Sequence, residues 1–112
     1  MLRAITFDLW GTLIDAGHNL IPERLEYLAQ ALPDCSLSQA KEAYRKAEEQ
    51  FGPVTSLGFP YCTATLLSLT LDAMGACLPP GRFEGVLKQW KEILLGSPPP
   101  LLDGALEVLS TL

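Results

Sequence analysis

The residues best suited to chemistry lie near the start of the chain, where Asp8 stands in a mostly apolar run over residues 2–9. A carboxylate at the C-terminal edge of a sheet lies where open α/β folds place their reactive groups, and it can act there as a nucleophile. Gly11 allows a tight turn close to a ligand, and the backbone N–H groups of Leu9 and Trp10 can help to hold an anion. The pattern therefore predicts a nucleophilic carboxylate beside an anion-binding turn.

Plainer interpretations of these residues remain open. Asp8 is also a residue type that caps a turn after a strand without any catalytic role, and Thr12 either orients the turn through its hydroxyl or is simply structural. Trp10 either lines a pocket or packs in a core. His18 lies where a linker would leave the turn, although surface histidines without a function are common.

The element that must position Asp8 is the run over residues 2–9. It is short and apolar and is followed by Trp10 and Gly11, which is typical of a parallel strand buried on both faces. No second run of this type follows, although one strand cannot satisfy its own backbone groups. Exposed strand edges and apolar surface therefore predict self-association, or a partner chain that completes the sheet.

The rest of the sequence predicts helices. Apolar residues at helical spacing indicate four of them, over residues 22–32, 37–51, 60–74 and 81–95. Ser36 and Gln39 have the spacing of a capping box at the start of the second helix, and Gly52 and Pro53 are expected to end it. The apolar faces predict a four-helix cluster. A stiff proline linker follows, and Asp103 is expected to cap a last amphipathic helix.

Composition excludes several classes of protein. The 48% hydrophobic and 19% charged content is typical of a globular chain, and the net charge of -5 argues against nucleic-acid binding. The apolar stretch over residues 61–78 contains Asp72, which favours a buried helix over a membrane span. Cys35, Cys62 and Cys77 form no CxxC pair and are interpreted as buried reduced thiols. Because no signal-peptide pattern is visible, we expect a cytoplasmic protein.

Residues 7–15, which read Phe-Asp-Leu-Trp-Gly-Thr-Leu-Ile-Asp, closely resemble the first motif of the haloacid dehalogenase superfamily, whose first aspartate forms a covalent intermediate. The order of parts extends the resemblance over the chain. It implies an N-terminal fragment of an α/β Rossmannoid fold, mostly helical as given, with one core β-strand plus a four-helix cap. The implied regions are the first strand and nucleophile loop (1–15), the helical cap (16–96), and a linker with the start of a core helix (97–112).

The resemblance implies a hydrolase of small molecules, haloacids or phosphate esters, with Asp8 as the nucleophile and Leu9, Trp10, Gly11 and Thr12 around the substrate. Phosphatases of the family carry a general acid where this chain has Trp10, whose indole exchanges no proton usefully at neutral pH. Haloacid dehalogenases are more similar, since they carry an aromatic residue there and expel a halide. A phosphatase-like protein would bind magnesium through Asp8 and the backbone carbonyl of Trp10, whereas a dehalogenase-like one needs no cofactor.

Other parts of the family's active site are not found in this sequence. Ser110 and Thr111 lie inside a helical pattern, so they are not the family's second motif, and Lys88 and Lys91 are predicted to be solvated. Stabilisation of charge by a cation is usually a large catalytic term, so we expect this chain alone to be weakly active at best. The alternative is a non-catalytic interaction module that retains the helical cap.

Overall fold

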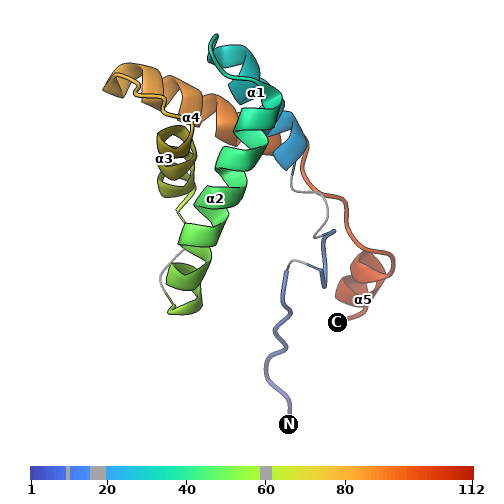
Figure 1. Ribbon diagram of the computed structural model, residues 1–112. Coiled ribbons are helices and arrows are strands. Elements are labelled where there is room, and N and C mark those ends of the chain that lie inside the picture. The colour runs from blue at the N-terminus through green and yellow to red at the C-terminus, as the bar shows by residue number, and fades with distance from the viewer. Residues whose placement is uncertain (10, 16–19, 59–61) are drawn as a thin grey trace.

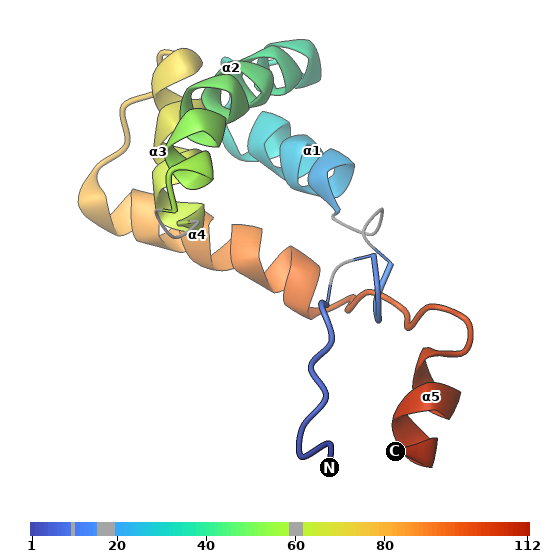
Figure 2. The same cartoon turned by 90° about the horizontal axis from the view of Figure 1, so that it is seen from below.

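The computed structural model describes residues 1–9, 11–15, 20–58 and 62–112 (Figure 1). Five α-helices lie in these ranges: α1 (Ile21–Ala31), α2 (Leu37–Ser56), α3 (Thr63–Ala73), α4 (Pro80–Leu95) and α5 (Ala105–Thr111). The first four form a cluster, and α5 lies apart from them near the N-terminal segment (Figures 1 and 2). The Cα radius of gyration is 17.3 Å, against about 13 Å for a compact domain of this length. The molecule is therefore elongated.

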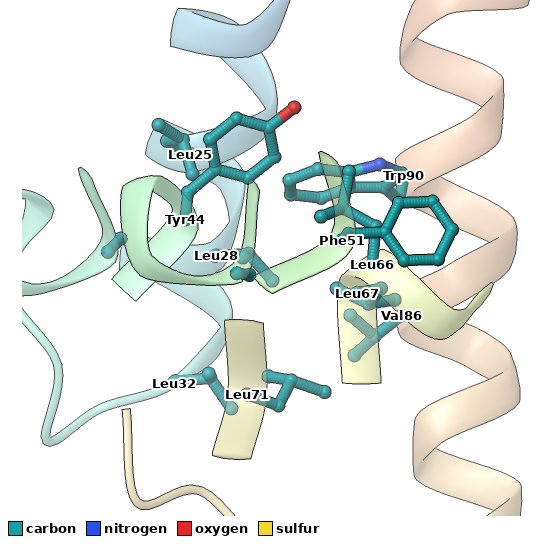
Figure 3. Packing of buried hydrophobic residues seen from close by; sticks show 12 residues of the cluster. Leu25, Leu28, Leu32, Tyr44, Phe51, Leu66, Leu67, Leu71, Val86 and Trp90 are labelled. Carbon is teal, nitrogen blue, oxygen red and sulfur yellow. The ribbon is translucent and has the colours of Figure 1, made fainter. Parts of the chain in front are cut away.

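The helical cluster is built on one hydrophobic core, part of which is shown in Figure 3. Trp90 of α4 is 1% exposed, and Leu28 of α1 and Leu67 of α3 are fully buried. Tyr44 of α2 lies near Trp90, with the ring centroids 6.2 Å apart. All four helices thus contribute to the same core, which confirms the predicted four-helix cluster.

The two ends of α2 test two predictions. At its start, the Ser36 hydroxyl accepts a hydrogen bond from the Gln39 backbone N–H at 3.2 Å, and the Gln39 side chain accepts one from the Ser36 backbone N–H at 2.8 Å. The capping box is therefore confirmed. The predicted end at Gly52 and Pro53 is wrong, because α2 continues to Ser56 with Pro53 inside it. Proline removes one helical hydrogen bond and crowds the carbonyl one turn back, and this cost falls on the last turn of α2 without ending the helix.

The start of α5 also differs from the prediction. Its N-cap is Gly104, with φ of 81°, and no side chain caps the helix, so Asp103 does not have the expected role. Glycine adopts this left-handed conformation without the steric cost of a Cβ atom. The chain therefore enters α5 through a backbone turn, and Asp103 stays exposed.

Helix α3 is confirmed as a buried helix. Leu66, Leu67, Thr70 and Leu71 are at most 3% exposed, while Asp72 faces outward. The Thr70 hydroxyl is satisfied by donating to the Leu66 carbonyl at 2.8 Å. In the part of the chain that the structure describes, no helix has both the length and the hydropathy that crossing a membrane requires.

The N-terminal segment, residues 1–9, does not form the predicted strand. The described ranges contain no β-strand, only an isolated antiparallel bridge between Ile14 and Leu101. Four apolar side chains of the segment are between 40% and 77% exposed: Leu2, Ile5, Phe7 and Leu9. The physical reason is that no second strand lies beside the segment in the described residues, so a ladder of hydrogen bonds cannot form. The structure thus has the helices of the predicted fold without its sheet.

Candidate functional site

The turn that follows Asp8 is organised around one carbonyl group. The Leu9 carbonyl accepts hydrogen bonds from the backbone N–H groups of Leu13, at 2.9 Å, and Ile14, at 3.0 Å. The Gly11 N–H donates to the Ile14 carbonyl at 2.8 Å, and Gly11 has φ of 75°. A positive φ of this size favours glycine, since a side chain would be strained there. The tight turn expected at Gly11 is therefore present.

The two linkers that connect this turn and α5 to the helical cluster are paired. The Asp15 N–H donates to the Pro100 carbonyl at 3.0 Å, and the Leu102 N–H donates to the Leu13 carbonyl at 2.9 Å. These bonds flank the antiparallel bridge between Ile14 and Leu101. The segment that leaves the turn and the segment that returns from the cluster therefore lie side by side and antiparallel. This pairing holds α5 next to the turn (Figure 2).

A cleft of about 210 Å³ lies between the turn and the start of α5. Phe7, Thr12 and Leu13 line one side, and the segment 103–105 with Val108 lines the other. Asp103 thus lies on the same cleft as Thr12. From the sequence, Asp103 was expected only to cap a helix. Its position after the proline linker is the signal that could have placed it near the turn.

The predicted site residues are exposed where the structure describes them. Asp8, Leu9, Gly11 and Thr12 are all accessible, and no Lys or Arg side chain forms an ion pair with Asp8 in the described ranges. Trp10 lies outside the described residues. The expected contribution of its backbone carbonyl to a magnesium site therefore has no geometry here. The described residues include no group of three or more His, Cys, Asp or Glu side chains placed to hold a metal ion.

The remaining candidates from the sequence lie away from the turn. Lys88 is exposed and approaches Glu92 at 3.9 Å along α4, and Lys91 is also exposed, which confirms that both are solvated. The hydroxyls of Ser110 and Thr111 donate to carbonyls one turn earlier in α5. His18, like Trp10, lies outside the described residues. The turn after Asp8 is thus the candidate site, and it draws on residues from both ends of the chain.

The prediction of buried cysteines is wrong for two of the three. Cys35 is half-buried, but Cys62 and Cys77 are exposed, and all three thiols are free. The Thr65 hydroxyl lowers the pKa of the Cys62 thiol, with smaller contributions from backbone N–H groups at the start of α3 and from the charge of Lys91. The cysteines lie in the connections before and between helices, where the sequence pattern gave no burial signal.

Comparisons of the chain with models of protein families, with curated proteins and with solved structures gave no match. The similarity to the haloacid dehalogenase superfamily thus depends on residues 7–15 and on the order of the parts along the chain.

Proposed function

We propose that this chain is the part of a haloacid dehalogenase-like hydrolase that carries the nucleophile and the helical cap. The observation that supports this most is the closed turn after Asp8, which leaves the carboxylate exposed beside the paired linkers of a well-packed helical cluster. An exposed carboxylate next to a turn and a cleft is accessible to a small molecule. In this proposal the cluster over residues 16–96 covers the substrate.

The reaction that these residues favour is displacement of a halide from a haloacid. A carboxylate oxygen of Asp8 attacks the carbon that carries the halogen, an ester bond forms, and the halide leaves with the bonding electron pair. Water then hydrolyses the ester, which releases a hydroxy acid and restores Asp8. The halide leaves without a proton, and in the second step the attacking water supplies the proton that the departing alkoxide takes, so the lack of an acid at Trp10 does not obstruct the reaction.

Hydrolysis of a phosphate ester is the less favoured form of the same proposal. An alkoxide leaving group needs a proton, and neither the Trp10 indole nor any residue on the described cleft except Asp103 is an acid. Magnesium usually takes one or two carboxylates together with waters and substrate oxygens. Since the described residues include no group of three or more His, Cys, Asp or Glu side chains placed to hold a metal ion, we assign no step to the metal.

The proposal also requires the N-terminal segment to become the core strand of a Rossmannoid sheet. Its exposed apolar side chains, and the absence of a β-ladder in the described residues, are typical of a strand that lacks neighbours. Helix α5 and its C-cap residue Leu112 add further exposed apolar side chains beside it, those of Leu106, Val108, Leu109 and Leu112. Strands supplied by further residues or by a partner chain would cover both surfaces, and activity would depend on that cover.

The same exposed surfaces favour a second candidate, a non-catalytic interaction module. A contiguous apolar surface is typical of a site where another protein binds. In that case the residues around Asp8 form only a turn, and the partner binds the segment 1–9 and α5.

One experiment separates the two candidates. The chain is incubated with a 2-haloacid, released halide is measured, and the ester on the protein is mapped by mass spectrometry. We expect slow halide release and a covalent adduct on Asp8, both lost in Asp8→Asn. Asp34→Asn is the matched control, since Asp34 is an exposed residue in the α1–α2 connection. Equal halide release from Asp8→Asn and the parent chain would contradict the hydrolase and favour the interaction module.

A further inference from the structure

Two cysteines that are far apart in the sequence line one cleft. Cys35 lies in the connection between α1 and α2, and Cys77 lies in the connection between α3 and α4. Both line a cleft of about 200 Å³, together with Met74 at the end of α3. The fold thus brings two cysteine residues to a single small cleft, although nothing in their sequence spacing indicates a pair.

Both connections are held against the same core, so the cleft is a defined feature of the fold. Leu32 also lines the cleft and is a buried member of the core cluster (Figure 3), and Leu78, which lines it as well, packs against that cluster. The Arg82 side chain at the start of α4 donates to the carbonyl of Ala31 at the end of α1, at 3.0 Å. The Ala76 N–H donates to the Leu71 carbonyl at 2.9 Å, which fixes the chain just before Cys77.

We propose that Cys35 and Cys77 form a redox-sensitive thiol pair that closes to a disulfide when the protein meets a peroxide. The sulfur of the exposed Cys77 attacks hydrogen peroxide, so that an S–O bond forms, the O–O bond breaks, and the leaving hydroxide takes the thiol proton as water, which gives a sulfenic acid. The sulfur of Cys35 then attacks the sulfenic sulfur, so the S–S bond forms and a second water leaves. Overall two thiols are oxidised and one peroxide is reduced to two waters.

Thiol chemistry fits this cleft better than metal binding. Asp34 also lines the cleft, yet the described residues include no group of three or more His, Cys, Asp or Glu side chains placed for a metal ion. Two sulfurs with different exposure suit a reactive thiol and a resolving thiol. Cys77 is exposed and therefore accessible to the oxidant, whereas Cys35 is half-buried.

Cys62 supplies an internal control. It lies at the opposite end of α3 from Met74, and an eleven-residue helix is about 16 Å long. Its thiol has a lowered pKa, so it should react with the same oxidant. If Cys62 is oxidised but the cross-link forms between Cys35 and Cys77, the place of these two residues in the fold decides which disulfide forms. The reactivity of a thiol alone would then not explain the product.

The test is oxidation of the whole chain with hydrogen peroxide at low protein concentration, followed by peptide mapping under non-reducing conditions. We expect a Cys35–Cys77 peptide as the main product in monomeric protein, formed equally in Cys62→Ser and lost in both Cys35→Ser and Cys77→Ser. Thermal unfolding of the oxidised chain should move up by several degrees, because the bond closes a long loop around α2 and α3. Because Cys35 is half-buried, Cys35→Ser could fail to fold. In that case the loss of the cross-link in Cys77→Ser, a change at an exposed position, still tests the proposal.

Oxidation that yields only sulfenic acids, only pairs that include Cys62, or only dimers between chains would overturn the proposal. So would a Cys35–Cys77 bond that appears equally fast in unfolded protein, since the folded cleft would then contribute nothing. The proposal concerns the helical cluster alone, so its outcome is independent of whether Asp8 is a nucleophile.

Discussion

The helical cluster and the base of the molecule, defined as residues 1–15 and 97–112, differ sharply in burial. In the cluster, residues such as Leu28, Leu67 and Trp90 are at most 1% exposed. In the base, Leu2 and Leu106 are 77% and 66% exposed, and Ala105 is the one buried residue among those that the structure describes there. A helix pairs its own backbone groups and needs a neighbour on one face only, whereas a strand needs another strand beside it to pair its backbone groups.

This difference bears on function, because the residues best suited to chemistry lie in the region whose apolar side chains are exposed. The turn after Asp8 has its own hydrogen bonds, but the segment before it has no pairing in the described residues. Catalytic groups need a rigid surrounding to be effective. The cluster is therefore expected to tolerate isolation, while the site depends on whatever covers the base.

The largest expected effect comes from Trp90→Ala. Trp90 is 1% exposed and contacts Tyr44 and Arg24, so truncation leaves a cavity in the shared core. Removing a buried aromatic residue of this kind costs about 3–5 kcal/mol of the free energy of unfolding. Leu106→Ala, in the exposed part of α5, should change it by less than about 0.5 kcal/mol. Urea denaturation followed by circular dichroism measures both, and similar losses would break the comparison between the regions.

A smaller effect is expected from Arg24→Met. The Arg24 side chain is 8% exposed, donates from Nε to the Trp90 carbonyl at 2.9 Å, and lies 5.3 Å from the Trp90 ring centroid. Losing a buried hydrogen bond from a charged donor, together with its contact on the ring, costs about 1–3 kcal/mol. Arg82→Met is the control, because Arg82 makes a similar bond to the Ala31 carbonyl while exposed to solvent.

That control should lose less than about 1 kcal/mol, since water replaces an exposed hydrogen bond easily. Equal losses from the two variants would mean that burial of Arg24 between α1 and α4 does not matter to the cluster. Both variants are to be measured in the same denaturation experiment as Trp90→Ala.

Next in size is Ser36→Ala, which removes one half of the capping box at the start of α2. The Gln39 N–H loses its hydrogen-bond acceptor, and loss of an N-cap side chain costs about 1 kcal/mol. Ser38→Ala, two residues further into the same exposed turn, should have almost no effect on the free energy of unfolding. A loss from Ser38→Ala equal to that from Ser36→Ala would show that the capping bond is not the cause.

The features that could be predicted from the sequence are those that depend on residues close together in the sequence. Apolar residues at helical spacing gave the four cluster helices, and the serine and glutamine three positions apart gave the start of α2. Local signals also misled at two points. Pro53 lies inside α2 and not after it, and Gly104 opens α5 where Asp103 was expected to cap it. In both cases the residue type that usually marks a helix boundary did not set the boundary here.

The features that could not be predicted depend on segments that meet only in the fold. The pairing of Ile14 with Leu101 and the shared cleft of Cys35 and Cys77 join distant positions that carry no common signal. For residues 1–9 the sequence pattern predicted a strand that the structure does not contain. A strand depends on non-local hydrogen bonds, which no part of the described chain supplies. The turn at Gly11 was predictable because its geometry is local.

The smallest expected effect on overall stability comes from Gly11→Ala, although it strains the candidate site directly. Gly11 has φ of 75°, so an alanine there costs about 1 kcal/mol locally. The midpoint of thermal unfolding should barely change, because the cluster core does not include the turn. Hydrogen exchange should instead quicken at the backbone N–H groups of Leu13 and Ile14, which both donate to the Leu9 carbonyl. If the unfolding midpoint fell as far as it does for Ser36→Ala, the turn and the cluster would form one cooperative unit, and the two regions could not be treated as separate.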